Sequence, residues 1–369
     1  MINEFHISGY RGFSQYSLAK LSRVNVFVGK NNAGKSSLLE ALHLYSTQLD
    51  IQTLQSIALR RGELFLDMES RMVDQLQFDL SHFFNGHRIK RNIVIELSSE
   101  KHTQTLQVNS YKERLQGEFH EPAFFSDHSR QDVCTLSAAS KTNQEIRPLY
   151  DMTISTTGAM CQTRRSYPRS SSFATRVFFI SPDSLDNATL MLMWNKMLVR
   201  NDESKIVNAL RILDPSVDSI AFLLPETINT RYVQRSPLSG VVVGIAKENR
   251  RYPLGSMGDG MKRLLAIALA LSCSSGGTLF IDEIDSGLHY SVMRDLWRLV
   301  INTAIANNVQ VFVSTHSLDC LRGLSVLTSE TFRDKSPVSL YTINANDTEA
   351  VYYSSKEIDT IIKNELEVR

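Results

Sequence analysis

The apolar positions of the chain form two ordered stretches separated by one of weak periodicity. Near the start, an apolar β-rich run at 24–28 leads into a glycine-containing loop, and apolar side chains from Leu38 onward continue at helical spacing. The last third predicts a helix at 261–271, a buried strand at 278–282, an amphipathic helix at 290–307 and a buried strand at 310–314. Apolar strands that alternate with helices indicate a mostly parallel sheet covered on both faces.

The rest of the chain is less regular. A short strand at 2–7 and a second strand after the turn at 9–12 precede the glycine-containing loop. The segment 126–172 is rich in Ser, Thr, Gln and Arg, and its lack of periodicity predicts loops and an insertion. At the end, a hairpin over 338–353 and a closing helix that begins with the Ser354 and Glu357 capping spacing are expected.

Composition limits the class of protein. With 369 residues, 42% hydrophobic and 21% charged, the chain is an ordinary globular protein, and its net charge of +1 argues against a strongly basic nucleic-acid coat. The four cysteines lack CxxC spacing, so they predict neither a zinc site nor a disulfide framework but a reducing cytoplasm. The longest apolar run, 264–271, is far shorter than the roughly 20 residues of a membrane span.

The loop after the first apolar strand, Gly29 to Ser37, has the complete GxxxxGK[ST] pattern between a strand and a helix. Its glycines let backbone N–H groups turn toward phosphate oxygens, Lys35 adds a full positive charge, and Ser36 is expected to ligate Mg²⁺. ATP and Mg²⁺ are therefore the predicted cofactors. The residues predicted to bind the nucleotide here are Gly29, Asn31, Asn32, Gly34, Lys35, Ser36 and Ser37.

A pair of acids follows the buried strand at 278–282, as a Walker B element requires. Asp282 is expected to hold the hydration shell of Mg²⁺ together with Ser36, and Glu283 to accept a proton from the attacking water. Adjacent acids at a strand end are common, but together with Lys35 they define a hydrolytic site. Lys35, Glu283 and His316 are the predicted catalytic residues, and His316 follows a strand expected to lie beside Walker B.

Several further motifs resemble those of ABC-type ATPases. The run Ser256-Met257-Gly258-Asp259-Gly260 resembles their signature sequence, which in that family contacts the nucleotide of the opposite subunit. His316 resembles their switch histidine and Asp285 their D-loop aspartate. A turn with an N-cap serine remains the alternative explanation of Ser256 taken alone.

The run from Glu283 to His289 and the opening segment Ile7 to Phe13 resemble the RecF, SMC and overcoming-lysogenization-defect branch of AAA family ATPases. In that branch an arginine, here Arg11, often approaches the nucleotide. The overcoming-lysogenization-defect proteins add a Toprim nuclease domain, but the tail after His316 holds no glutamate-then-DxD cluster, so no nuclease activity is expected of this chain. The Q-loop glutamine has two candidates, Gln75 and Gln77.

The resemblance implies an α/β fold: an ABC-type P-loop ATPase head with a mostly parallel sheet flanked by helices, an N-terminal antiparallel β portion and a middle insertion. The expected parts are a first half of the ATPase lobe, a β-rich portion with the insertion, a second half of the lobe, and a C-terminal hairpin and helix. Their predicted bounds are 1–50, 51–175, 176–325 and 326–369.

Two functions follow from the resemblance. The first is a molecular switch that forms a homodimer around ATP and controls a separately encoded nuclease or toxin in bacterial phage defence. The second is a RecF-like clamp that binds DNA through basic clusters such as 87–91 or 164–169. These clusters are explained equally well as charged side chains on a solvated surface. No membrane partner is expected, and a neighbouring nuclease gene would favour the first function.

Overall fold

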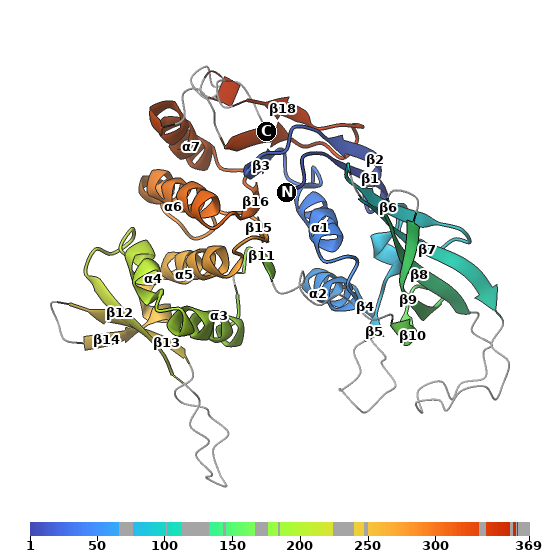
Figure 1. The fold of residues 1–369 in the computed structure, drawn as a ribbon, viewed down its shortest axis with the longest axis horizontal. Helices are drawn as coiled ribbons and strands as arrows, with labels where there is room; N and C mark the ends of the chain where they lie inside the picture. The colour runs from blue at the N-terminus through green and yellow to red at the C-terminus, as the bar shows by residue number, and fades with distance from the viewer. Residues whose placement is uncertain are drawn as a thin grey trace, which may run out of the picture.

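The structure is a computed structural model. The residues that this structure describes are 1–65, 77–100, 102–112, 133–142, 145–166, 176–183, 185–223, 240–246, 250–331, 337–354, 357–358 and 360. Figure 1 shows a central sheet seen nearly edge-on, with one stack of helices on its left and α1, α2 and a second sheet on its right. None of the helices in the described ranges combines the length and hydrophobicity that a membrane crossing requires.

The central sheet has six strands in the order β11-β15-β16-β3-β17-β18. Its first five strands are parallel, and only β18 runs antiparallel to its neighbour. The strands are β11 (Val177–Ile180), β15 (Thr278–Ile281), β16 (Gln310–Ser314), β3 (Val24–Val28), β17 (Val338–Thr342) and β18 (Val351–Tyr353). The parallel strands therefore end at one common edge, as the sequence predicts for a sheet built from alternating strands and helices.

The two faces of this sheet carry side chains of different kinds. One face is aliphatic, with residues such as Val26, Ile281 and Val313 in the core beneath the left-hand helices. The other face carries a row of aromatic rings that crosses all six strands. The rings, from one edge of the sheet to the other, belong to Phe179, Phe280, Phe312, Phe27, Tyr341 and Tyr352, with successive centroids 5.3 to 6.2 Å apart.

Four long helices contribute to the aliphatic core. They are α3 (Asn187–Val199), α5 (Asp259–Cys273), α6 (Met293–Ala306) and α7 (Leu318–Thr331). The shorter α4 (Glu203–Leu210) packs on α5, beside a small sheet of β12 (Val217–Leu223), β13 (Gly240–Ile245) and β14 (Arg250–Pro253). Short 3-10 turns, Leu254–Met257 and Tyr290–Val292, precede α5 and α6, so the expected helix at 290–307 becomes regular only at Met293.

The aromatic face packs against α1 (Lys35–Ser46), α2 (Ile51–Arg61) and an antiparallel sheet in the order β10-β9-β8-β7-β6-β1-β2. Its strands are β1 (Phe5–Tyr10), β2 (Phe13–Leu18), β6 (Val94–Ser98), β7 (His102–Lys112), β8 (Val133–Thr142), β9 (Glu145–Ser155) and β10 (Met160–Ser166). A two-stranded pair, β4 (Leu64–Phe65) and β5 (Gln77–Phe78), and a 3-10 turn at Ser81–Phe83 lie beside it. The first strand lies three residues later than the predicted 2–7.

The expectation of loops in 126–172 is wrong for the part that the structure describes. This segment holds β8, β9 and β10, and alternate residues such as Leu136, Met152 and Ile154 are fully buried. The period-two pattern is hard to read in the sequence, because small residues such as Ala138 occupy inward positions and long polar runs surround them. The segment is thus an integral part of the sheet and not a detachable insertion.

At the C-terminus, the predicted hairpin is confirmed, because β17 and β18 pair antiparallel. The predicted cap is also present, since the backbone N–H of Ser354 donates to the Glu357 carboxylate at 2.6 Å. Most of the closing helix lies outside the described residues, as do Gln75 and the side chain of Gln77.

Candidate active site

The phosphate loop connects β3 to α1 and is enclosed by segments from both ends of the chain. Gly29 has φ +149°, and a Cβ there would lie 2.5 Å from the carbonyl oxygen of Ile343. Gly34 has φ +96°, and a Cβ there would lie 2.9 Å from the ring of Phe13. Both positions therefore require glycine, and the loop is held between β2 and the loop that follows β17.

Lys35 lies inside this cradle. Its Nζ donates to the carbonyl oxygens of Gly29 at 2.7 Å and of Lys30 at 2.8 Å. Burial lowers the pKa of the Lys35 ammonium group, and the carboxylates of Asp282 and Glu283 oppose that shift. The cation thus occupies the position from which a lysine of this motif can reach phosphate oxygens.

The other loop residues surround Lys35. Asn31 and Asn32 are exposed, and Asn32 has a left-handed φ of +64°, whereas Ser36 and Ser37 form the half-buried first turn of α1. No side chain caps that turn, so its backbone N–H groups are available to an anion. The hydroxyl of Ser36 and the carboxylate of Asp282 are oxygen ligands of the kind that Mg²⁺ prefers.

The two acids follow β15 at the same edge of the sheet. Asp282 is buried and accepts a hydrogen bond from the Ser314 hydroxyl at the end of β16. That hydroxyl also accepts from the backbone N–H of Glu283 at 2.8 Å. Glu283 itself has φ +49°, a conformation unusual for a residue with a side chain. Ser314, which sequence reasoning missed, therefore orients both acids.

His316 and Asp285 lie beside Glu283. The Nδ1 of His316 is 3.9 Å from Oε1 of Glu283, and both side chains are about half exposed. Asp285 accepts a hydrogen bond of 2.5 Å from the hydroxyl of Thr315. The structure thus brings together Lys35, Asp282, Glu283, Asp285 and His316, which the sequence predicts from three separate segments.

Arg263, a residue with no predicted role, links the helix of the signature run to these acids. From α5, its guanidinium donates to the carbonyl oxygens of Asp282 at 2.5 Å and of Glu283 at 2.9 Å, and to that of Ser181. Burial lowers the pKa of Arg263 to about 10, against the opposing effect of nearby carboxylates. The N-terminal part of α5 and Walker B are therefore fastened to each other.

The signature run lies at the surface. Ser256 and Gly258 are exposed just before α5, and a Cβ at Gly258 would meet no heavy atom within 4 Å. A Cβ at Gly260 would lie 2.7 Å from the carbonyl oxygen of Gly287, so the first turn of α5 packs on the loop after Walker B. This exposure agrees with a role toward a second subunit.

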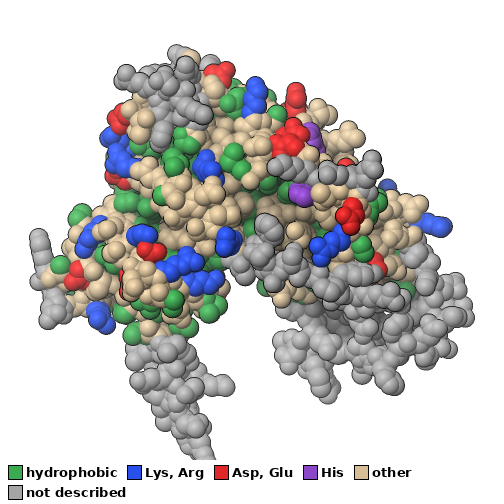
Figure 2. Space-filling view, viewed as in Figure 1, with side chains coloured by type: hydrophobic (Ala, Val, Ile, Leu, Met, Phe, Trp, Pro, Cys, Tyr) green, Lys and Arg blue, Asp and Glu red, His purple; other side chains and the backbone are tan. Residues whose placement is uncertain are grey.

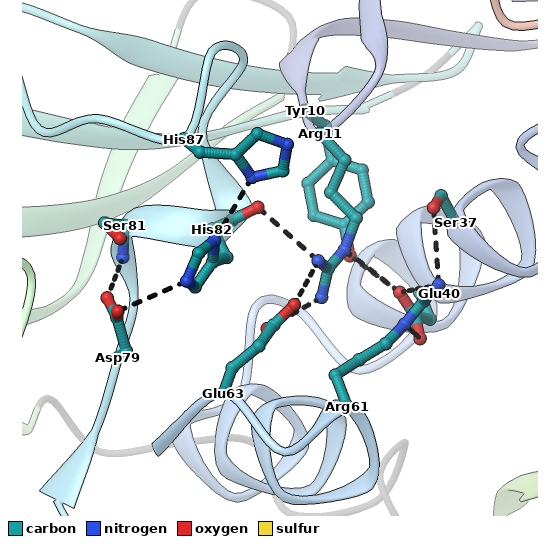
Figure 3. Close-up of polar contacts among 10 residues, drawn as sticks. All are labelled: Tyr10, Arg11, Ser37, Glu40, Arg61, Glu63, Asp79, Ser81, His82 and His87. Carbon is teal, nitrogen blue, oxygen red and sulfur yellow. Dashed lines mark hydrogen bonds and ion pairs between the residues drawn. The ribbon is translucent and has the colours of Figure 1, made fainter. Parts of the chain in front are cut away.

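The structure does not bring Arg11 to the phosphate loop. Its guanidinium is buried in ion pairs with Glu63, at 2.5 Å, and Glu40, at 3.1 Å (Figure 3). It also lies 5.0 Å from the ring centroid of Phe83. The physical reason is that the carboxylates of Glu40 and Glu63 neutralise the charge of the Arg11 guanidinium. The backbone of Arg11, with φ +49°, forms part of the β1–β2 turn. In the arrangement described, Arg11 ties that turn to α1 and to the segment after α2.

Arg60 and Arg61, at the end of α2, interact with residues of the nucleotide site. Arg61 forms two hydrogen bonds to Glu40, at 2.9 and 3.2 Å, and one to the hydroxyl of Ser37 at 3.3 Å (Figure 3). Arg60 stacks on Phe179 with 3.9 Å from guanidinium carbon to ring centroid. Two consecutive arginines at a helix end were the only signal in the sequence, and it is a weak one.

This arrangement defines a P-loop nucleotide hydrolase, and comparison with known proteins agrees. The family described as "AAA ATPase domain" matches residues 1–163, and the family described as "AAA domain, putative AbiEii toxin, Type IV TA system" matches residues 183–321. Both descriptions are of AAA ATPase domains, so the chain belongs to the AAA ATPases and is an ATPase.

Individual relatives are similar over different lengths. An "ATP/GTP phosphatase" of Helicobacter pylori is 23% identical over 354 residues, with 89% of each chain covered. An uncharacterized protein of Methanocaldococcus jannaschii, MJECL10, is 30% identical over 166 residues, which cover 39% of this chain and 70% of the relative. Among solved structures, an SMC head bound to the C-terminal winged-helix domain of ScpA has a TM-score of 0.49 at 12% identity, covering 97% of this chain and 99% of that chain.

Replacing Ser314 by Ala should impair the acids without touching a phosphate-binding residue. The change leaves the Glu283 N–H and one oxygen of buried Asp282 without this partner, which costs about 1–3 kcal/mol of stability, and should also lower ATP turnover. Ser339→Ala is the control, because Ser339 is equally buried and hydrogen-bonded but lies near the start of β17. Equal turnover of the two variants, measured alongside urea unfolding, would refute the orienting role.

Proposed function

We propose that the protein is an ATP-dependent molecular switch that closes into a homodimer around ATP and controls a separate effector. The observation that carries the proposal is the division of the ATPase parts between two surfaces. Lys35, Asp282, Glu283 and His316 lie together at the edge of the central sheet, whereas Ser256 is exposed elsewhere, in front of α5. A second copy can supply Ser256 and Gly258 to the nucleotide held by the first.

The residues of this chain then have distinct roles in hydrolysis. Bound Mg²⁺, held by Ser36 and by water on Asp282, would neutralise charge on the β- and γ-phosphates. Lys35 binds the same phosphates, and Glu283 accepts the proton of the attacking water. His316, close to Glu283, contacts the γ-phosphate, and Asp285 positions the loop that meets the partner subunit.

The link to defence rests on the family description. One matching family is described as "AAA domain, putative AbiEii toxin, Type IV TA system". In the proposed function, the damaging step, cleavage of nucleic acid or another toxic reaction, belongs to a separate effector in the cytoplasm, and this chain supplies the ATP-dependent control.

Deleting 126–172 is not a suitable way to locate the effector surface. That segment supplies the buried side chains of β8 and β9, so its removal would expose the core of the antiparallel sheet. Substitutions at exposed positions, which leave this core intact, are needed instead.

Lys35→Ala should abolish ATP binding measured by titration calorimetry, because it removes the ammonium group that lies in the cradle, bonded to the carbonyl oxygens of Gly29 and Lys30. Lys30→Ala is the matched control, since Lys30 is exposed in the same loop. ATP affinity that falls equally in both variants would mean that bulk charge, and not the position of Lys35, determines binding.

Glu283→Gln should keep ATP binding but reduce hydrolysis by roughly 10²- to 10⁴-fold, the scale of a lost general base. The ATP-bound dimer should then accumulate and be visible by light scattering. Glu330→Gln, which removes an exposed carboxylate from α7, should leave turnover unchanged. Wild-type turnover in Glu283→Gln would remove Glu283 from the mechanism.

Ser256→Arg should prevent dimer formation without weakening ATP binding to the monomer, because a bulky cation would occupy the surface offered to the second nucleotide. Light scattering with ATP in the Glu283→Gln background measures this, with Ser329→Arg on the exposed face of α7 as control. An ATP-dependent dimer that persists in Ser256→Arg would contradict the assignment of the signature run.

A further inference from the structure

A second pocket lies on the helical side of the central sheet, away from the phosphate loop. Its volume is about 670 Å³, within the range of small-molecule sites. Most of its described lining side chains are hydrogen-bond donors: Arg176, Asn195, Lys196, Arg200 and Ser275. Figure 2 shows Lys and Arg side chains gathered over α3 and α5, the helices that form much of the wall.

The position of the pocket separates it from the ATPase site. Arg176 directly precedes β11, and Ser275 lies between α5 and β15, so both belong to the amino edge of the parallel sheet. The phosphate loop follows β3, and Asp282 follows β15, at the carboxyl edge. A ligand in this pocket would therefore not compete directly with ATP.

The pocket carries an excess of positive charge. None of Arg176, Lys196 and Arg200 has a carboxylate partner among the residues that the structure describes. Two helices, α3 and α5, end here and contribute about half a negative charge each. The three positive side chains exceed the roughly one negative charge of the two helix ends, so the pocket has a net positive charge. Stabilisation of the helix ends therefore does not explain why all three cations are present.

The electrostatic environment of the Cys273 thiol is consistent with a positively charged pocket. Its thiol lies in the pocket wall, and burial raises its pKa, while the charges acting on it, those of Lys196 and Arg200, lower it. Beside these cations, Val199 and Cys273 supply a small apolar surface. The pocket thus offers charged donors around a space with one apolar wall.

We propose that this pocket binds a phosphate-bearing ligand at a site separate from the ATPase centre. Guanidinium groups pair with phosphate through parallel N–H donors, and an ammonium group adds a compact charge. The Val199 and Cys273 wall can accept the sugar or base of a nucleotide. The same chemistry is offered by a free phosphorylated molecule and by the backbone of a nucleic acid, and the experiment separates the two.

Binding of two probes tests the site, with the phosphate loop first saturated by a non-hydrolysable ATP analogue and Mg²⁺. The probes are inorganic tripolyphosphate, followed by calorimetry, and a fluorescent 20-nucleotide single strand, followed by anisotropy. The variant is Lys196→Gln/Arg200→Gln, which changes two exposed side chains of one helix surface. Arg298→Gln/Arg322→Gln, which removes two exposed charges from α6 and α7, is the matched control.

The site predicts that Lys196→Gln/Arg200→Gln weakens probe binding by about tenfold or more, because two charge-assisted contacts are lost, while the control binds like wild type. Loss of tripolyphosphate binding alone identifies a free phosphorylated ligand. Loss of strand binding, with the log–log salt slope reduced by about 1.4, identifies nucleic acid.

Two results would overturn the proposal. They are no binding of either probe to the wild type, and equal weakening of probe binding in both double variants. ATP hydrolysis is measured in the same preparations. It should persist in Lys196→Gln/Arg200→Gln, so an inactive ATPase site and an absent second site give different results.

Discussion

The whole active site depends on the parallel register of three strands, β15, β16 and β3, at the centre of one sheet. The register pairs Ile281 with Val313 and Ser314 with Phe27, so the three strands end level with one another. Aliphatic side chains on one face and aromatic rings on the other hold these strands between two cores. A slip of one residue would exchange the two faces and place aromatic rings where the helices pack on aliphatic side chains.

Much of this arrangement is predictable from the sequence, because its signals are local. The segment 310–314 has an apolar, β-rich centre at 311–313, and it forms a strand with the predicted bounds. The phosphate loop and the acids after β15 are recognisable for the same reason: each motif is a short run whose chemistry requires a strand end beside it. Parallel order then follows from the alternation of strands and helices.

Other features could not be predicted, because they depend on contacts between distant segments. Ser314 looks like the last residue of a strand, and only the fold shows that its hydroxyl bonds both acids. Arg11 has the residue type expected of a nucleotide contact, yet Glu40 and Glu63 enclose it once α1 and the segment after α2 are in place. His43 is similar: burial against Phe179 and Phe280 lowers its pKa to about 3, so it is a neutral core residue.

Arg263 gives the site a mechanical property. The Arg263 side chain, on α5, hydrogen-bonds the backbone of Asp282 and Glu283. Helix α5, which begins next to Ser256, therefore cannot move independently of these acids. The contact between Gly260 and Gly287 fastens the same two segments at a second point. A force applied to the exposed start of α5 would therefore reach the hydrolytic acids within one rigid unit.

The placement of β3 has a consequence for how the protein is made. Both neighbours of β3 in the sheet, β16 and β17, come from the last part of the described chain, and the phosphate loop is closed from behind by Ile343 and Ala345. At 5–20 residues per second, a ribosome needs roughly 15 to 60 s to synthesise the chain that separates β3 from these neighbours. During that interval the nascent chain contains every loop residue but no finished nucleotide pocket, so the site cannot form until β17 and the loop after it have been synthesised.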